Sequence, residues 1–278
     1  MLTRNIKYKN SKPPMNSRLA KNSPYYNGMV DCLLFNEGAG ANYLNIGSSK
    51  WYGFPKGGLS IWNNTGKYKG PSTTSIKAIE LPSKVNIVAG DFAIRALFRM
   101  DSFNGTYACI FSKKAGGVRE FGIFIDSSGN LSFYDIGGSS GFGGVGLGLT
   151  TGVMYDMILT RIGTEAYLYL NGILKLNTGN FSGGVTGTTG STTNPISLGW
   201  DETSYPNNYG INTYYAFQTW AGRGLTAGEV LDLYNNPFSF VRPIKKRIGI
   251  QSSSAAVPPV TIYNRRSFGY RAGSRGVF

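Results

Sequence analysis

The strongest constraint on the fold is a series of short apolar stretches, many of alternating character, that are separated by turn residues. Clear examples are residues 92–99, 121–125 and 155–161. Alternation places successive side chains on opposite faces of an extended chain, so these stretches predict strands. Asn171-Gly172 is the clearest turn, because both residues tolerate positive φ in a type I′ hairpin. The pattern predicts an antiparallel sandwich of many short strands.

One segment is typical of a helix. Thr226 and Glu229 have the spacing of a capping box, in which the two side chains bond backbone N–H groups of the first turn. An apolar stripe follows, and Asn235-Asn236-Pro237 ends it. The stripe consists of Val230, Leu231, Leu233 and Tyr234. We therefore expect an all-β body with one short helix near its C-terminal end.

The chain contains no histidine, and this absence excludes whole classes of chemistry. Ser-His-Asp and Cys-His nucleophiles and His-ligated zinc sites all need an imidazole. The two cysteines, Cys32 and Cys109, form no Cys-x-x-Cys pair and lie in apolar stretches. One long-range disulfide is possible, but two buried thiols fit the apolar settings better. A reducing folding compartment is therefore expected.

The net charge of +14 is concentrated at the two ends of the chain. Residues 1–28 contain six Lys or Arg and no acid, and residues 241–278 contain eight and no acid. Removing these from the totals of 28 basic and 14 acidic residues leaves 14 of each between 29 and 240. Together with the Pro- and Ser-rich sequence near both ends, this predicts a basic N-terminal arm (1–28), a neutral body (29–243) and a basic C-terminal arm (244–278).

Both predicted arms also carry aromatic and apolar residues, more than a solubilising tail requires. Guanidinium groups interleaved with rings suit an acidic protein surface, where arginine pairs with carboxylates and rings fill pockets. They also suit nucleic acid, but a neutral body favours the protein partner. The residues expected to bind the partner are Arg4, Lys7, Lys9, Arg18, Arg265, Arg266, Phe268, Tyr270, Arg271, Arg275 and Phe278.

Several segments in this order resemble a known family. Residues 33–40, 155–161 and 166–172 resemble concanavalin A-like jelly rolls of the laminin G type. The most specific segment is residues 223–238, whose Leu-Tyr-x-x-Pro-Phe ending is similar to that of laminin G-like proteins of tailed bacteriophages. The resemblance covers about residues 29–243 and leaves out both arms. It implies an all-β, antiparallel concanavalin A-like jelly-roll sandwich with one short C-terminal helix.

The resemblance also implies a function. We expect a non-enzymatic structural protein of a virion, assembled in the host cytoplasm: a capsid decoration or cement protein, or a tail-associated component. Its basic arms would bind neighbouring capsid or tail subunits, and it would form a homo-oligomer on the particle. The alternative is a lectin-like module that binds host or environmental glycans. Nucleic acid is a less favoured partner, and no stretch approaches the roughly 20 apolar residues of a membrane helix, so no membrane insertion is expected.

The fold family includes glycoside hydrolases, whose reaction needs a pair of carboxylates. One strand would supply them as Glu-x-Asp-x-Glu, because alternate residues share a face. No such run occurs, and the adjacent Asp201 and Glu202 would point to opposite faces. An enzyme is therefore not expected. Loop oxygens could hold a structural calcium ion, but the candidates lack cation-loop spacing, so no metal residue and no cofactor is assigned. These candidates are Asp91, Asp101, Asp201, Asn207 and Asn208.

Two aromatic clusters are candidates for sugar binding. In the first, rings could stack on apolar sugar faces while neighbouring polar groups bond hydroxyls. Its candidate residues are Trp200, Asp201, Tyr205, Asn207 and Tyr209. The second cluster is expected to serve packing rather than binding. It consists of Trp51, Tyr52, Phe54 and Trp62.

Overall fold

The computed structural model describes most of the central part of the chain. The described residues are 12–37, 42–56, 61–64, 69–73, 78–82, 90–103, 107–115, 118–134, 140–178, 195–199 and 211–244. Backbone contacts divide the chain into two units, Met1–Ile244 and Lys245–Phe278.

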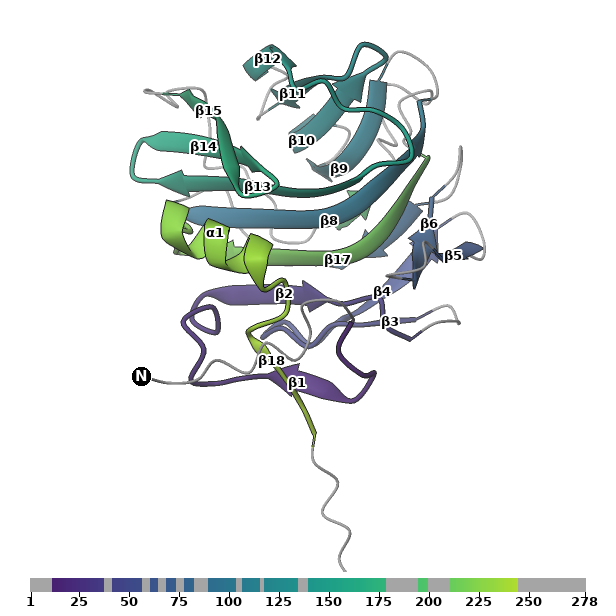
Figure 1. The fold of residues 1–278 in the computed structure, drawn as a ribbon, viewed down its shortest axis with the longest axis vertical. Helices are drawn as coiled ribbons and strands as arrows, with labels where there is room; N and C mark the ends of the chain where they lie inside the picture. The colour runs from purple at the N-terminus through teal and green to yellow at the C-terminus, as the bar shows by residue number, and fades with distance from the viewer. Residues whose placement is uncertain are drawn as a thin grey trace, which may run out of the picture. The chain divides into compact units, whose positions relative to one another are not determined.

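Two large antiparallel sheets form the body (Figure 1). The strands of the first sheet are β2 (Met29–Leu33), β5 (Ile61–Asn64), β6 (Lys69–Ser72), β8 (Phe92–Ser102), β13 (Met154–Ile162), β14 (Glu165–Leu170), β15 (Ile173–Thr178) and β17 (Ile211–Ala221). Their order is β15-β14-β13-β8-β17-β6-β5, and β2 pairs with β17.

Within the described ranges, the second sheet has eight strands. They are β3 (Tyr43–Leu44), β4 (Tyr52–Lys56), β7 (Ala78–Leu81), β9 (Tyr107–Ala115), β10 (Val118–Asp126), β11 (Asn130–Tyr134), β12 (Ser140–Gly146) and β16 (Ile196–Leu198). Their order is β12-β11-β10-β9-β16-β7-β4-β3, so β16 inserts between β9 and β7 from a distant part of the chain.

Strand alternation explains how the first sheet buries both of its faces. On β8, Ile94, Ala96 and Phe98 belong to the main core between the two sheets. Their neighbours Ala93 and Leu97 belong to a second apolar cluster. Because successive side chains on a strand point to opposite faces, this second cluster lies on the outer face of the first sheet.

The single helix in the described residues, α1 (Ala227–Asn235), covers that outer face (Figure 1). It buries Val230 and Leu233 against Trp220 of β17 and the ring of Tyr25. Both halves of the predicted capping box are present at Thr226. The predicted all-β sandwich with one short helix is thereby confirmed, and no helix in the described residues is long and apolar enough to cross a membrane.

The predicted hairpin at Asn171-Gly172 is also confirmed. Both residues have positive φ, 53° and 77°, and Leu170 pairs with Ile173 across the turn. Cys32 and Cys109 form no disulfide and are both buried, in agreement with the two-thiol interpretation. Burial raises the pKa of the Cys32 thiol.

The described part of the predicted N-terminal arm differs from an extended arm. Ser17, Ala20 and Tyr25 are buried. The strand β1 (Ser17–Leu19) pairs with β18 (Val241–Pro243), which follows α1. Residues 12–28 therefore pack as part of the body, because the outer face of the first sheet offers apolar surface that α1 alone does not cover.

Candidate functional site

Most of the residues predicted to bind a partner or a glycan lie outside the described residues, and their roles stay predictions. Arg18 is described and is exposed on β1. The other partner-binding candidates, which are not described, are Arg4, Lys7, Lys9, Arg265, Arg266, Phe268, Tyr270, Arg271, Arg275 and Phe278. The same holds for the glycan candidates Trp200, Asp201, Tyr205, Asn207 and Tyr209.

The second aromatic cluster is not packed as the sequence analysis expected. Trp51, Tyr52 and Phe54 have 44%, 58% and 40% of their surface exposed. The reason is the alternation along β4, where the intervening Gly53 lies against the side chains of Leu81 and Leu33. Tyr52 and Phe54 therefore point away from the core between the sheets. The side chain of Trp62 lies outside the described residues.

Strand register places polar side chains beside this exposed aromatic pair. Phe54 is the partner of Glu80 on β7, Glu80 is the partner of Ser197 on β16, and Ser197 is the partner of Ser112 on β9. Residues directly opposite each other in a sheet share a face. We call these four residues the cross-strand row. Their chain neighbours, such as Ile79, lie in the main core, so the row is on the outer face of the second sheet.

The cross-strand row changes in character along its length. Phe54 is 40% exposed, Glu80 and Ser197 are each 8% exposed, and Ser112 is 1% exposed. Aromatic surface at one end thus leads to a carboxylate and two hydroxyl groups at the other. Tyr52 extends the aromatic end, since it lies two residues before Phe54 on the same strand.

The second candidate site is the two-stranded sheet formed by β1 and β18, which we call the terminal ribbon. Its register is Ser17 with Pro243, Arg18 with Arg242, and Leu19 with Val241. Ser17 and Val241 are buried, while Arg18 and Arg242 are exposed. The ribbon continues by one residue on β18, because the Ile244 N–H donates to the Asn16 carbonyl at 3.1 Å.

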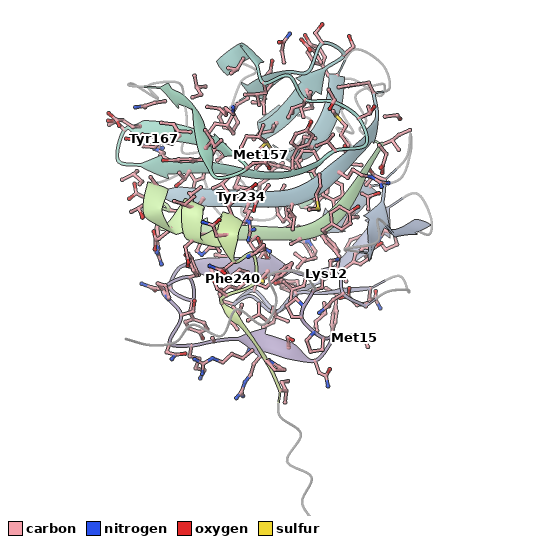
Figure 2. The ribbon with its side chains drawn as sticks, in the orientation of Figure 1. Lys12, Met15, Met157, Tyr167, Tyr234 and Phe240 are labelled. Carbon is pink, nitrogen blue, oxygen red and sulfur yellow. The ribbon has the colours of Figure 1, made fainter. Side chains whose placement is uncertain are left out.

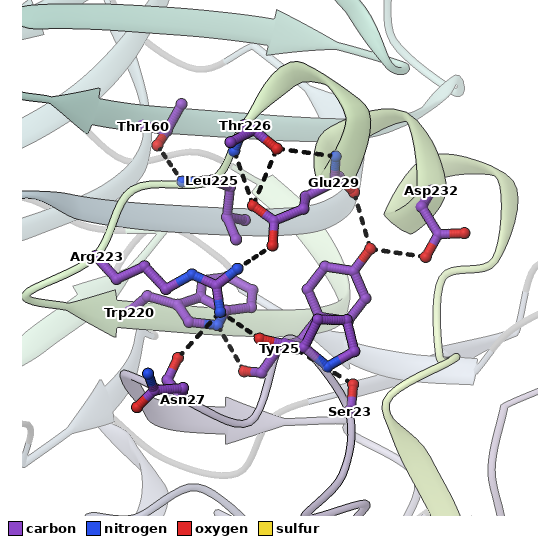
Figure 3. Close-up of polar contacts among 11 residues, drawn as sticks. Ser23, Tyr25, Asn27, Thr160, Trp220, Arg223, Leu225, Thr226, Glu229 and Asp232 are labelled. Carbon is purple, nitrogen blue, oxygen red and sulfur yellow. Dashed lines mark hydrogen bonds and ion pairs between the residues drawn. The ribbon is translucent and has the colours of Figure 1, made fainter.

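Hydrogen bonds fix the ribbon and the segment that follows it to the body (Figure 3). The Tyr25 hydroxyl donates to Asp232 Oδ2 at 2.7 Å, and the Glu229 carbonyl oxygen lies 3.2 Å from the same hydroxyl. Trp220 Nε1 donates to the Tyr25 carbonyl at 2.9 Å. Arg223 bonds both the Glu229 carboxylate and the Pro24 carbonyl. The N-terminal segment is thus tied to α1 and β17 together.

A buried ion pair holds the end of α1 on the first sheet. Arg95 Nε lies 2.8 Å from Asp156 Oδ1, and its Nη2 lies 2.5 Å from Oδ2. The same guanidinium donates to the carbonyls of Leu233 and Pro237 at 3.2 and 2.9 Å. A buried charge needs such partners. The chain leaving α1 is thereby directed toward β18.

Lys12 anchors the start of the described chain (Figure 2). Its Nζ donates to the Phe35 carbonyl at 2.6 Å and lies 5.5 Å from the centre of the Tyr215 ring. Burial lowers the pKa of Lys12 from 10.5 to about 7, and the nearby Glu37 carboxylate opposes part of that shift. Burial also raises the pKa of Glu37. Asn36 Nδ2 completes the anchor by donating to the Pro13 carbonyl at 3.0 Å.

In the described ranges, no group of three or more Cys, Asp or Glu side chains is placed to hold a metal ion. Two of the carboxylates considered as calcium ligands contact protein groups. Asp91 accepts a hydrogen bond from the Gly163 N–H at 2.7 Å. Asp101 pairs with Arg99 and accepts from Thr213 Oγ1 at 2.5 Å.

Comparison with known proteins supports the architecture. A family model described as Laminin_G_3, concanavalin A-like lectin/glucanases superfamily, matches residues 73–224. A search of curated protein sequences gave no match.

Solved structures of low sequence identity share the fold. One is the Trypanosoma rangeli sialidase in complex with sialic acid, with a TM-score of 0.57, 12% identity, and 76% of this chain and 33% of that chain covered. Another is the binding domain of botulinum neurotoxin serotype D/C, with a TM-score of 0.56, 13% identity, and 75% and 52% covered. This chain therefore spans about a third of the length of the sialidase and about half of the length of the toxin binding domain.

Proposed function

Because the chain belongs to the concanavalin A-like lectin/glucanases superfamily, we propose that it is a non-enzymatic binding protein whose jelly-roll body recognises carbohydrate. The observation that carries this proposal is the cross-strand row with its exposed aromatic end. Rings can stack on the apolar face of a sugar, while a carboxylate and hydroxyl groups bond its hydroxyls. Phe54 and Tyr52 supply the rings, and Glu80 and Ser197, each 8% exposed, supply the polar groups.

The structural neighbours give this proposal its chemical context. One was solved with sialic acid, and another is the binding domain of a toxin. Both share the fold at low sequence identity, so the sugar that this chain binds is left open. For this chain we therefore propose only a lectin-like role.

The composition of the row supports binding without hydrolysis. Glycoside hydrolysis of the common kind uses two carboxylates, about 5 Å apart in retaining enzymes. The cross-strand row contains a single carboxylate, that of Glu80. We therefore propose no reaction for this face.

Alanine variants on a glycan array test the proposal. The probe is a glycan that binds the unmodified chain on the array. Tyr52→Ala with Phe54→Ala should lower the affinity for this glycan at least about tenfold, which corresponds to about 1.4 kcal/mol. The melting temperature should change little, because both rings are largely exposed. The matched control is Ile173→Ala with Leu174→Ala, which removes exposed apolar side chains from β15.

Two results would count against this site. Unchanged affinity in the Tyr52 and Phe54 variant would remove the cross-strand row as the binding face. If Tyr205→Ala with Tyr209→Ala then abolished retention, the segment that follows Trp200 in the sequence would be the site instead. Absence of binding by the unmodified chain to any glycan on a broad array would overturn the carbohydrate function itself.

A second candidate function is attachment to a virion as a capsid decoration, cement or tail-associated protein. The observation that favours it is the position of the two acid-free basic segments. The predicted C-terminal arm starts at Ile244, whose N–H donates to the Asn16 carbonyl, and residues 1–11 of the predicted N-terminal arm precede Lys12. Four residues of extended chain reach at most about 14 Å, so both segments begin at one side of the body.

Co-sedimentation with particles of the virus that encodes the chain tests this second function. We expect the full chain to pellet with the particles and a chain shortened after Pro243 to stay in the supernatant. Circular dichroism confirms that the shortened chain keeps its β-structure. Equal retention of the two chains, or absence of the full chain from the pellet, would contradict attachment by the C-terminal segment.

A further inference from the structure

The outward face of the terminal ribbon presents two arginines directly opposite each other. Arg18 and Arg242 are cross-strand partners, and both side chains are exposed. Over the described ranges, neither guanidinium forms an ion pair or a hydrogen bond. Directly opposed residues have Cβ atoms about 5 Å apart, and like charges at that spacing destabilise a strand pair. The ribbon therefore holds two positive charges together at a cost in stability.

The terminal segments cannot neutralise this pair. Residues 12–28 and 236–244, which build the ribbon and its connections, contain no Asp or Glu. Residues 1–11 and 245–278 contain none either. All acidic residues of the chain lie between Asp31 and Asp232. In the described part of the chain no carboxylate pairs with Arg18 or Arg242, so the carboxylates of another molecule can do so.

Exposed apolar side chains accompany the arginine pair. Ile244 is 46% exposed and lies two residues after Arg242, hence on the same side of the strand. Met15, just before β1, is 55% exposed and lies at the edge of the molecule in Figure 2. Arginine and methionine are enriched in protein–protein interfaces, whereas a phosphate backbone is bound chiefly by charge. The combination fits a protein partner.

We propose that the outward face of the terminal ribbon is a docking site for an acidic protein surface. Two neighbouring carboxylates of the partner pair with Arg18 and Arg242, and apolar side chains of the partner pack on Ile244 and Met15. This site does not depend on the carbohydrate proposal. The ribbon lies on the outer face of the first sheet, where Val241 joins the second apolar cluster, while the cross-strand row lies on the outer face of the second sheet. A docked molecule thus keeps the row accessible.

Charge reversal in the full chain tests the site. The probe is a short fluorescein-labelled peptide rich in glutamate and leucine, and its affinity is measured by fluorescence anisotropy at about 0.15 M salt. Arg18→Glu with Arg242→Glu should weaken binding at least about tenfold, or about 1.4 kcal/mol. The control Lys50→Glu with Lys175→Glu changes the net charge equally at exposed positions away from the ribbon and should weaken binding less than about twofold.

The single variant Arg18→Glu separates binding from stability. It places opposite charges across the ribbon, so the cross-strand interaction becomes attractive and the melting temperature should not fall. Peptide affinity should nevertheless fall, because one guanidinium is lost from the site. In the unmodified chain, amide resonances of Arg18, Leu19 and Arg242 should shift on addition of the peptide.

Three outcomes would overturn the proposal. In the first, the ribbon double variant and the lysine control bind the peptide equally, so only net charge matters. In the second, the ribbon variant keeps its peptide affinity but loses binding to duplex DNA with a steep salt dependence, so the partner is nucleic acid. In the third, sedimentation shows that the unmodified chain self-associates and the ribbon variant does not, so the partner is a second copy. None of these bears on the glycan variants, so the two proposals fail separately.

Discussion

At the residue scale, Arg95 and Lys12 are two cations that contact inner parts of the body. Arg95 is fully buried but reaches two carboxylate oxygens and two carbonyl groups. Lys12 Nζ donates to the Phe35 carbonyl, lies 5.5 Å from the centre of the Tyr215 ring, and is near the Glu37 carboxylate, which raises the pKa of Lys12. Desolvation by burial is the largest effect on the pKa of Lys12 and lowers it to about 7. The docking of residues 12–14 on the body thus depends on a group that titrates near neutral pH.

Lys12 should give the stability of the protein a pH dependence. Between about pH 7 and 10.5, the unfolded chain binds a proton at Lys12 that the folded chain has released, so the free energy of unfolding should rise with pH across this window. Lys12→Met should remove this slope, and Lys50→Met, at an exposed lysine, should keep it. Urea denaturation at a series of pH values measures it. An equal slope in the Lys12 variant would show that the amine titrates near its usual value.

At the element scale, two features of the β14–β15 turn both favour glycine at position 172: the backbone conformation and the contact with α1. Gly172 has a φ of 77°, and a Cβ atom there would lie 3.0 Å from the Tyr234 ring. Gly163, in the β13–β14 turn, also has positive φ, but open space surrounds it. Gly228, within α1, has ordinary helical geometry and open space. Substitution of Gly163 thus reports on backbone strain alone, and substitution of Gly172 reports on strain together with crowding by Tyr234. Substitution of Gly228 reports on helix propensity.

Alanine at each of these glycines should give a different result. Gly163→Ala should cost about 1 kcal/mol of unfolding free energy, since left-handed backbone disfavours a Cβ atom. Gly172→Ala should cost at least about 2 kcal/mol, because the contact with Tyr234 adds to that strain. Gly228→Ala should stabilise by up to about 1 kcal/mol. Chemical denaturation of the variants tests the order, and equal costs at Gly172 and Gly163 would show that α1 yields at Tyr234.

At the scale of the whole molecule, the body has three layers rather than two. The main core lies between the sheets, and the second apolar cluster lies between the first sheet and a cover of α1, β1 and β18. Tyr25, from the N-terminal stretch, is 2% exposed and packs against Phe240 with ring centres 6.1 Å apart. The cover is therefore assembled from both ends of the body.

The folded body should accordingly begin at Lys12 rather than at Met29. A fragment of residues 12–244 should unfold cooperatively in urea. A fragment of residues 29–244 should lose at least about 3 kcal/mol, since it removes Tyr25 and uncovers Trp220. Urea transitions followed by tryptophan fluorescence and far-ultraviolet circular dichroism compare the two. Equal stability of the fragments would show that residues 12–28 add nothing to the fold.

Local patterns in the sequence were enough to predict the strands, the helix and the key hairpin. Alternation along residues 92–99 depends only on the geometry of an extended chain. The capping box at Thr226 and the turn at Asn171-Gly172 depend on a few adjacent residues. The family comparison supports the resemblance for residues 73–224, a range that ends where the closing segment 223–238 begins.

Tertiary structure alone decided which faces and which distant residues meet. The cross-strand row needs β16 between β7 and β9, and no local pattern in the sequence encodes that register. Likewise, residues 12–28 show no periodicity, so the sequence suggested an arm. Their apolar groups become a layer of the body because β8 and β17 together create an apolar outer face, and burying that face against Tyr25 removes it from water. Pairing of β1 with β18 then sets Arg18 against Arg242, more than two hundred residues apart in the chain.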